Sequence, residues 1–110
     1  MTADSDFCRL GRAVIETEMA ALAALETRID GTFADACRIL LACSGRVVVL
    51  GMGKSGHIGG KLAATLASTG TPAFFVHPGE AGHGDLGMIT PGDCIIALSN
   101  SGETEEINRL

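Results

Sequence analysis

The chain has 110 residues and is acidic, with eight Lys and Arg against thirteen Asp and Glu and a net charge of −5. This length allows one domain with one core, and 46% hydrophobic against 19% charged residues argues against disorder and against a coiled coil. Because no basic cluster interrupts the acidic balance and the chain lacks Trp and Tyr, we expect no nucleic-acid partner. No stretch approaches the ~20 apolar residues that span a bilayer, so no membrane partner is expected either.

The cysteines and the first residues predict a cytoplasmic protein. Cys8, Cys37, Cys43 and Cys94 form no CxxC pair, and the composition is not that of a disulfide-rich secreted domain. We expect each of them to be a reduced thiol that behaves as a small buried hydrophobe. The opening residues MTADSDFCRL contain two Asp and no apolar run of the kind found in signal peptides.

Two helices are predicted before the first strand. Apolar residues recur at steps of three and four over residues 4 to 29, which indicates one long amphipathic helix that ends at Asp30. Thr32, followed three residues later by Asp35, resembles an N-terminal capping arrangement. A second helix with its own apolar face is therefore expected from residue 33 until Ser44-Gly45 ends it.

Three short apolar runs, at residues 47 to 50, 73 to 76 and 94 to 98, are typical of buried parallel strands. A helix is predicted between the first two runs, over residues 57 to 69, and another after residue 104. This alternation predicts a three-layer α-β-α open parallel sheet with right-handed crossovers, an α/β fold that two helices precede. With the strand order 2-1-3, the switch point lies between the carboxyl ends of strands 1 and 3.

Two segments rich in Gly and Ser, at residues 51 to 57 and 99 to 104, follow strands 1 and 3 at that switch point. A glycine-rich turn that opens a helix offers unpaired backbone N–H groups and the positive end of the helix dipole to an anion. In the second segment, hydroxyl groups can add hydrogen bonds to phosphate oxygens. The plain alternative is helix capping by Ser101, but two such loops at matching ends favour a shared phosphate site.

Two nucleotide motifs are formally suggested and then disfavoured. The glycines after strand 1 fit GxGxxG, yet a dinucleotide site needs an acid at the end of strand 2, where Val76-His77-Pro78 stands. A P-loop needs a glycine five residues before the Gly53-Lys54 pair, and that position is Val48. Neither dinucleotide redox chemistry nor nucleotide hydrolysis is therefore expected.

The motifs GMGKSGHIG, FFVHPGEAGHGDLGM and SNSGET resemble the sugar-isomerase (SIS) domain of arabinose-5-phosphate isomerases. SNSGET is shared across SIS domains, whereas the first two motifs are typical of this isomerase branch. The resemblance covers residues 46 to 110 and continues more loosely through the leading helices. It implies a flavodoxin-like fold and one truncated SIS domain over residues 1 to 110, with helices at 1 to 45 and three strands with their helices beyond. No CBS domains are expected in the chain.

This resemblance implies an enzyme that interconverts D-ribulose 5-phosphate and D-arabinose 5-phosphate through an enediolate. Such an enzyme supplies synthesis of the sugar Kdo for lipopolysaccharide or capsule, requires no cofactor and assembles as a homotetramer. The family domain continues through further strands, which carry another Glu and another His needed for activity. The alternative is therefore a sugar-phosphate-binding module without turnover, or an inactive fragment.

The resemblance also assigns roles to individual residues. Lys54 and Glu106 match the catalytic positions. Lys54 stands at the tip of the first loop, where its ammonium can reach substrate oxygens or phosphate, and a solvated surface lysine is the alternative. Without the resemblance, Glu106 would be read as a complement to a helix dipole. His77 matches a position that can hold zinc, which usually takes three or four protein ligands, and His83 is the one candidate to join it. The substrate-binding positions implied are Ser55, Gly70, Thr71, His83, Ser99, Asn100, Ser101 and Thr104.

Overall fold

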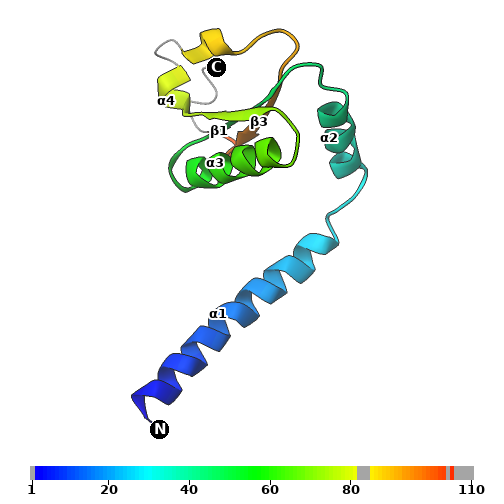
Figure 1. Ribbon diagram of the computed structural model, residues 1–110. Helices are drawn as coiled ribbons and strands as arrows, with labels where there is room; N and C mark the ends of the chain where they lie inside the picture. The colour runs from blue at the N-terminus through cyan, green and yellow to red at the C-terminus, as the bar shows by residue number, and fades with distance from the viewer. Residues whose placement is uncertain (1, 82–84, 104, 106–110) are drawn as a thin grey trace. The chain divides into compact units, whose positions relative to one another are not determined.

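The structure is a computed structural model that describes residues 2–81, 85–103 and 105 (Figure 1). The chain divides into two units, Met1–Cys37 and Arg38–Leu110, and each is described by itself. Among the described residues, no helix combines the length and the apolar character needed to cross a membrane.

The first unit contains α1, Ala3–Glu26, which confirms the predicted amphipathic helix except at its end. The helix stops three residues before residue 29 because Arg28 N–H bonds to the Leu25 carbonyl, which tightens the last turn. Its apolar stripe is exposed, as Phe7 illustrates at 68%. Cys8 on the same helix is exposed too, and Cys37, Cys43 and Cys94 are half-buried, so the expectation that every cysteine is a buried hydrophobe is wrong.

The second helix, α2, spans Gly31–Leu41 and begins two residues earlier than predicted. Asp30 caps it, because its Oδ1 accepts the Thr32 N–H at 3.0 Å and its carbonyl oxygen accepts the Ala34 N–H at 3.1 Å. The capping role predicted for Thr32 with Asp35 is therefore wrong. A carboxylate two residues upstream already satisfies an orphan N–H group at this end of the helix.

The sheet confirms the predicted strands and their order. Its strands are β1 (Val47–Gly51), β2 (Ala73–Val76) and β3 (Cys94–Leu98), all parallel in the order β2-β1-β3. Every residue of β1 is buried, because neighbours flank the strand on both sides and side chains cover both faces. The predicted α/β fold with a central first strand is therefore confirmed.

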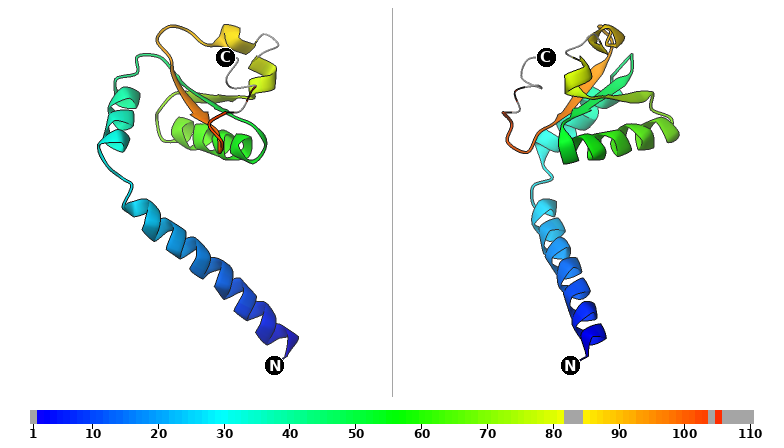
Figure 2. Two further views of the ribbon diagram at one scale, coloured as in Figure 1. Left: turned by 180° about the vertical axis from the view of Figure 1, so that it is seen from behind. Right: turned by 90° about the vertical axis from the view of Figure 1, so that its left-hand side faces the viewer.

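Helix α3, Gly53–Ser68, lies along one face of the sheet (Figure 2). Val47 and Val49 of β1 pack against Ala63 of this helix, with Leu62 and Leu66 beside them. On the other face the core contains Val48, Leu50 and Val76, with Phe74 and Ile89 packed against them. The short helices α4 (Pro78–Ala81) and η1 (Asp85–Met88) belong to the connection from β2 to β3.

The start of α3 corrects the prediction of a loop over residues 51 to 57. The helix begins at Gly53, after Met52 in an extended conformation, and Gly56 N–H already bonds to the Met52 carbonyl at 3.2 Å. The four glycines of α3 lower its apparent helix propensity, but packing against the sheet overrides that preference. Gly53 has a φ of 56°, which only glycine adopts without strain, and it makes the sharp entry into the helix.

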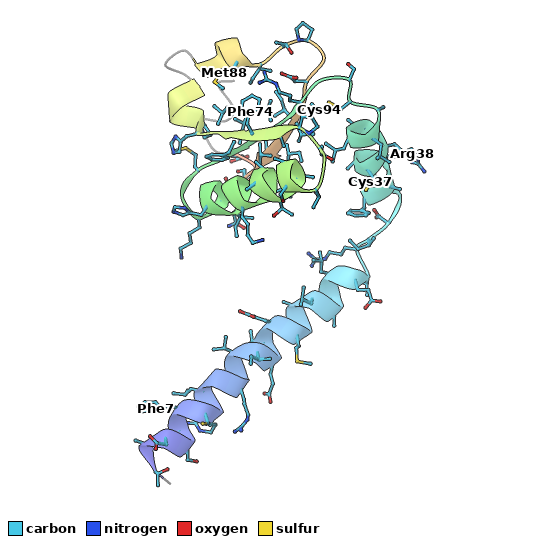
Figure 3. The ribbon with its side chains drawn as sticks, viewed as in Figure 1. Phe7, Cys37, Arg38, Phe74, Met88 and Cys94 are labelled. Carbon is cyan, nitrogen blue, oxygen red and sulfur yellow. The ribbon has the colours of Figure 1, made fainter. Side chains whose placement is uncertain are left out.

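At the amino-terminal edge of the sheet, Asp93 ties the start of β3 to β1. Its carboxylate accepts the Arg46 N–H at 2.7 Å and the Thr90 N–H at 2.8 Å, and its side chain is 1% exposed. The Arg46 guanidinium also donates to the Met88 carbonyl at 2.6 Å and lies 4.5 Å from the centre of the Phe74 ring (Figure 3). The Arg46 N–H bond, and then the Thr90 N–H bond, hold the pKa of Asp93 below its usual value.

We expect this carboxylate to stabilise the fold above the usual pKa of Asp, near 3.8, and to lose that effect as the pH falls through its lower folded value. Asp93→Asn should therefore lower the melting temperature at pH 7 by several degrees, with the difference from wild type shrinking toward pH 3. Thermal unfolding between pH 3 and pH 7 measures this, and Glu16→Gln on exposed α1 is the control. A difference that stays constant over the range would contradict the role given to Asp93.

Candidate functional site

The carboxyl ends of β1 and β3 lie side by side, since Gly51 is in register with Leu98. A cavity of about 630 Å³ lies at this junction. Among the predicted site residues, it brings together Lys54 and Ser55 from α3 with Ser99 and Asn100 from the segment after β3. Ile58, Ala97 and Leu98 complete its lining. The two Gly/Ser segments therefore line one cavity at the switch point of the sheet.

The first wall of the site is the amino-terminal turn of α3. Met52 precedes the helix without a side-chain cap, so the N–H groups of Gly53, Lys54 and Ser55 come before the first i to i−4 bond. An uncapped helix start of this kind, in a 16-residue helix, favours an anion through its N–H groups and its dipole. The Lys54 ammonium adds a full positive charge to the same turn.

Close contact between β1 and α3 sets the position of this turn. A Cβ atom added to Gly56 would lie 2.7 Å from the Gly51 carbonyl oxygen, and one added to Gly51 would lie 2.6 Å from the Ser55 carbonyl oxygen. Backbone atoms fill the space that a side chain would need at both positions. The two glycines therefore allow the helix start to sit directly on the end of the strand.

The second wall is the turn after β3. Ser99 Oγ accepts the Gly102 N–H at 3.0 Å, and Ser101 Oγ accepts the Glu103 N–H at 3.0 Å. Gly102 has a φ of 73°, so the turn depends on glycine. Ser101 does not line the cavity, and its bond to Glu103 is of the local kind that the capping alternative described.

Gly70 and Thr71 lie at the other end of α3, by the amino-terminal edge of the sheet. There Thr71 N–H bonds to the Leu66 carbonyl, and Val47 N–H bonds to the neighbouring Pro72 carbonyl. A helix of 16 residues is about 24 Å long, so these two residues and Lys54 cannot contact one small ligand within a single copy of the chain. His83, Thr104 and Glu106 fall outside the described residues.

His77 follows β2 and is exposed. Its Nδ1 accepts the Gly79 N–H at 3.1 Å, which leaves Nε2 as the ring nitrogen able to bind a metal. Across the part of the chain that the structure describes, no three His, Cys, Asp or Glu side chains gather into a metal site. The described residues around His77 therefore do not fit zinc by themselves, and no step of the chemistry below depends on it.

Sequence reasoning missed the apolar part of the cavity. Ile58, in the helix predicted over residues 57 to 69, is 62% exposed and lines the cavity. The signal was present, because residues three and four apart share a helix face, and Ile58 stands at those spacings from Ser55 and Lys54. A helix that began at Gly53 instead of residue 57 would have placed the three side chains together.

The fold and the cavity define an open parallel α/β domain with a candidate anion site at its switch point. The family model described as SIS domain matches residues 40–110, and the chain belongs to this family. The predicted SIS resemblance is confirmed.

Relatives point to one branch of that family. The chain is 62% identical over 105 residues to arabinose 5-phosphate isomerase KdsD of Yersinia pestis and 59% identical over 110 residues to that of Pseudomonas aeruginosa. These matches cover 96% and 100% of the chain but 32% and 34% of the relatives, so the chain spans about a third of their length. A solved structure of an Escherichia coli CFT073 protein in complex with arabinose 5-phosphate superposes with a TM-score of 0.86 at 49% identity, covering 99% of this chain and 57% of that one.

Proposed function

We propose that this domain belongs to an enzyme that interconverts D-arabinose 5-phosphate and D-ribulose 5-phosphate. The observation that carries the proposal is the cavity in which Lys54 and the uncapped start of α3 face the Ser99-Asn100 turn. Support also comes from relatives named as this isomerase and from the similar structure in complex with arabinose 5-phosphate. The cavity exceeds the volume of a pentose phosphate, and its N–H groups and hydroxyls suit phosphate oxygens.

The proposed reaction moves one proton between neighbouring carbons. A base removes the proton from C2 of arabinose 5-phosphate, and an enediolate forms across C1 and C2. A proton is then returned to C1, while the proton of the C2 hydroxyl passes to the oxygen on C1, which gives the ketose. The Lys54 ammonium stabilises the developing oxyanion, and Glu106 is proposed as the proton carrier. C1 is reduced while C2 of the same molecule is oxidised, so the proposed reaction requires no redox cofactor.

Deuterium exchange tests this proposal in the protein that carries the domain. Incubation of arabinose 5-phosphate in D₂O should produce ribulose 5-phosphate with deuterium at C1, measured by NMR together with the rate of ketose formation. Ketose that forms without deuterium would point to internal transfer. If there is neither ketose nor exchange while the sugar phosphate still binds, the protein is the binding module that the sequence left as the alternative, and the proposed activity is wrong.

The cellular role is a further part of the proposal. In the cytoplasm, isomerisation of ribulose 5-phosphate to arabinose 5-phosphate would supply the synthesis of Kdo for lipopolysaccharide or capsule, as the resemblance implies. We also propose a homo-oligomer, a tetramer by resemblance, and the exposed apolar residues of α1 support association. These residues are Phe7, Leu10, Val14, Ile15, Met19, Leu22 and Leu25. Sedimentation equilibrium would contradict the oligomer if it gave the mass of one copy at micromolar concentration.

A further inference from the structure

Two half-buried thiols meet at the amino-terminal edge of the sheet, away from the cavity. Cys43 precedes β1 and Cys94, which Figure 3 labels, opens β3; a side-chain hydrogen bond joins the two. They also share a backbone partner, because the Arg46 carbonyl oxygen accepts the Cys94 N–H at 3.0 Å and lies 3.6 Å from Cys43 Sγ. Although they are far apart along the chain, the sheet places the two sulfur atoms side by side.

Neighbouring backbone bonds fix this arrangement. Cys43 Sγ lies 3.5 Å from the Gly92 carbonyl oxygen, which also accepts the Gly45 N–H at 2.9 Å, and Cys94 Sγ lies 3.7 Å from the Ile39 carbonyl oxygen. The segments that carry the two cysteines are therefore already linked before any covalent bond forms. Backbone movement is the main obstacle to forming a disulfide, and these bonds already hold the two segments together.

We propose that Cys43 and Cys94 form a reversible dithiol–disulfide site that responds to low-molecular-weight disulfides such as oxidised glutathione. The thiolate of one cysteine attacks the small disulfide, RSSR, and releases RS⁻ as a mixed disulfide forms. The second cysteine then attacks the protein sulfur of that mixed disulfide and releases a second RS⁻. In total, two protein thiols are oxidised to one disulfide, and RSSR is reduced to two RSH.

The surroundings of Cys94 disfavour its thiolate. The pKa of the Cys94 thiol is raised, first by its hydrogen bond to Cys43, then by burial, and also by the nearby charge of Asp93. Because the thiolate is the reactive form, these surroundings slow attack by Cys94 itself. The disulfide would close a loop across β1, α3 and β2, so the oxidised protein should unfold at a higher temperature than the reduced protein.

Peptide mapping tests the proposal directly, because trypsin separates all four cysteines. Cleavage after Lys and Arg places Cys8 in peptide 1–9, Cys37 in 29–38, Cys43 in 39–46 and Cys94 in 62–109. After equilibration with a glutathione redox buffer and quenching with iodoacetamide, we expect peptides 39–46 and 62–109 joined by a disulfide. This species should exceed any cross-link that involves Cys8 by at least about tenfold, since positioned thiols have a high effective concentration.

Two variants and one physical measurement complete the test. Cys8→Ser combined with Cys37→Ser should keep the cross-link, whereas Cys43→Ser should abolish it. The oxidised wild type should melt higher than the reduced form by about 5 °C or more, a shift that Cys43→Ser removes. The proposal is overturned if folded wild-type protein forms only mixed glutathione disulfides at Cys43 or Cys94, or if cross-links to Cys8 are equally abundant.

Discussion

Lys54→Gln is expected to lower kcat/KM for arabinose 5-phosphate by about 100-fold or more, while leaving the fold intact. The ammonium lies in the first turn of α3 and lines the cavity with Ser99 and Asn100, so it is the described positive charge nearest the proposed oxyanion. Removing one such stabilising group typically costs roughly 10²–10³ in rate. Glutamine keeps most of the length of the side chain and removes its charge.

The matched control is Lys61→Gln, which removes an exposed lysine of the same helix outside the cavity lining. Steady-state kinetics on both variants, with circular dichroism to check folding, separates the site from general charge effects. The kinetics should show the Lys54 loss mainly in kcat, since the proposed contact strengthens as the oxyanion develops. Equal activities for the two variants would remove Lys54 from the mechanism and leave it as a surface charge.

Gly56→Ala is expected to destabilise the domain by about 2 kcal/mol, a typical cost of overpacking a filled site. The added Cβ would stand 2.7 Å from the Gly51 carbonyl oxygen, so either β1 or the first turn of α3 must move. For a domain of this size, that loss corresponds to a fall in melting temperature of roughly 8–16 °C. Because the same turn carries Lys54, sugar-phosphate affinity should fall with stability.

The chain offers its own control for this substitution in Gly60, on the same helix. No atom lies within 4 Å of a Cβ added there, so Gly60→Ala should raise stability by up to about 1 kcal/mol through improved helix propensity. Urea unfolding of both variants gives the comparison. If both substitutions change the free energy of unfolding in the same direction, contact between β1 and α3 does not explain the glycine at position 56.

The strands could be read from the sequence because their signal is local. Val47, Val48 and Val49 form a β-branched run that only a strand buried on both faces accommodates well, and their burial confirms it. The start of α3 could not be read in the same way, because its glycines weaken the helix signal. These glycines allow α3 to contact β1 closely, and that contact exists only in the folded domain.

The site was predictable only in part, for a similar reason. Adjacent loops followed from the strand order, so Lys54 and Ser99 were correctly placed together. Gly70 and Thr71 lie at the far end of α3 from Lys54 and Ser99. Assigning site residues by resemblance to a family does not show such a separation. In α1, periodicity identified the apolar face but carried no information about what covers it.

The position of β3 in the sheet has a consequence for how the domain opens. Within the described sheet β2 and β3 both pair only with β1, but α3 packs much more extensively on β2 than on β3, so β3 is the less supported edge strand. Strands held on one side are the first to separate in local unfolding. The Ser99-Asn100 side of the cavity would separate together with β3. A ligand that contacts both loops therefore holds β3 against β1, and its binding should make unfolding of the sheet more cooperative.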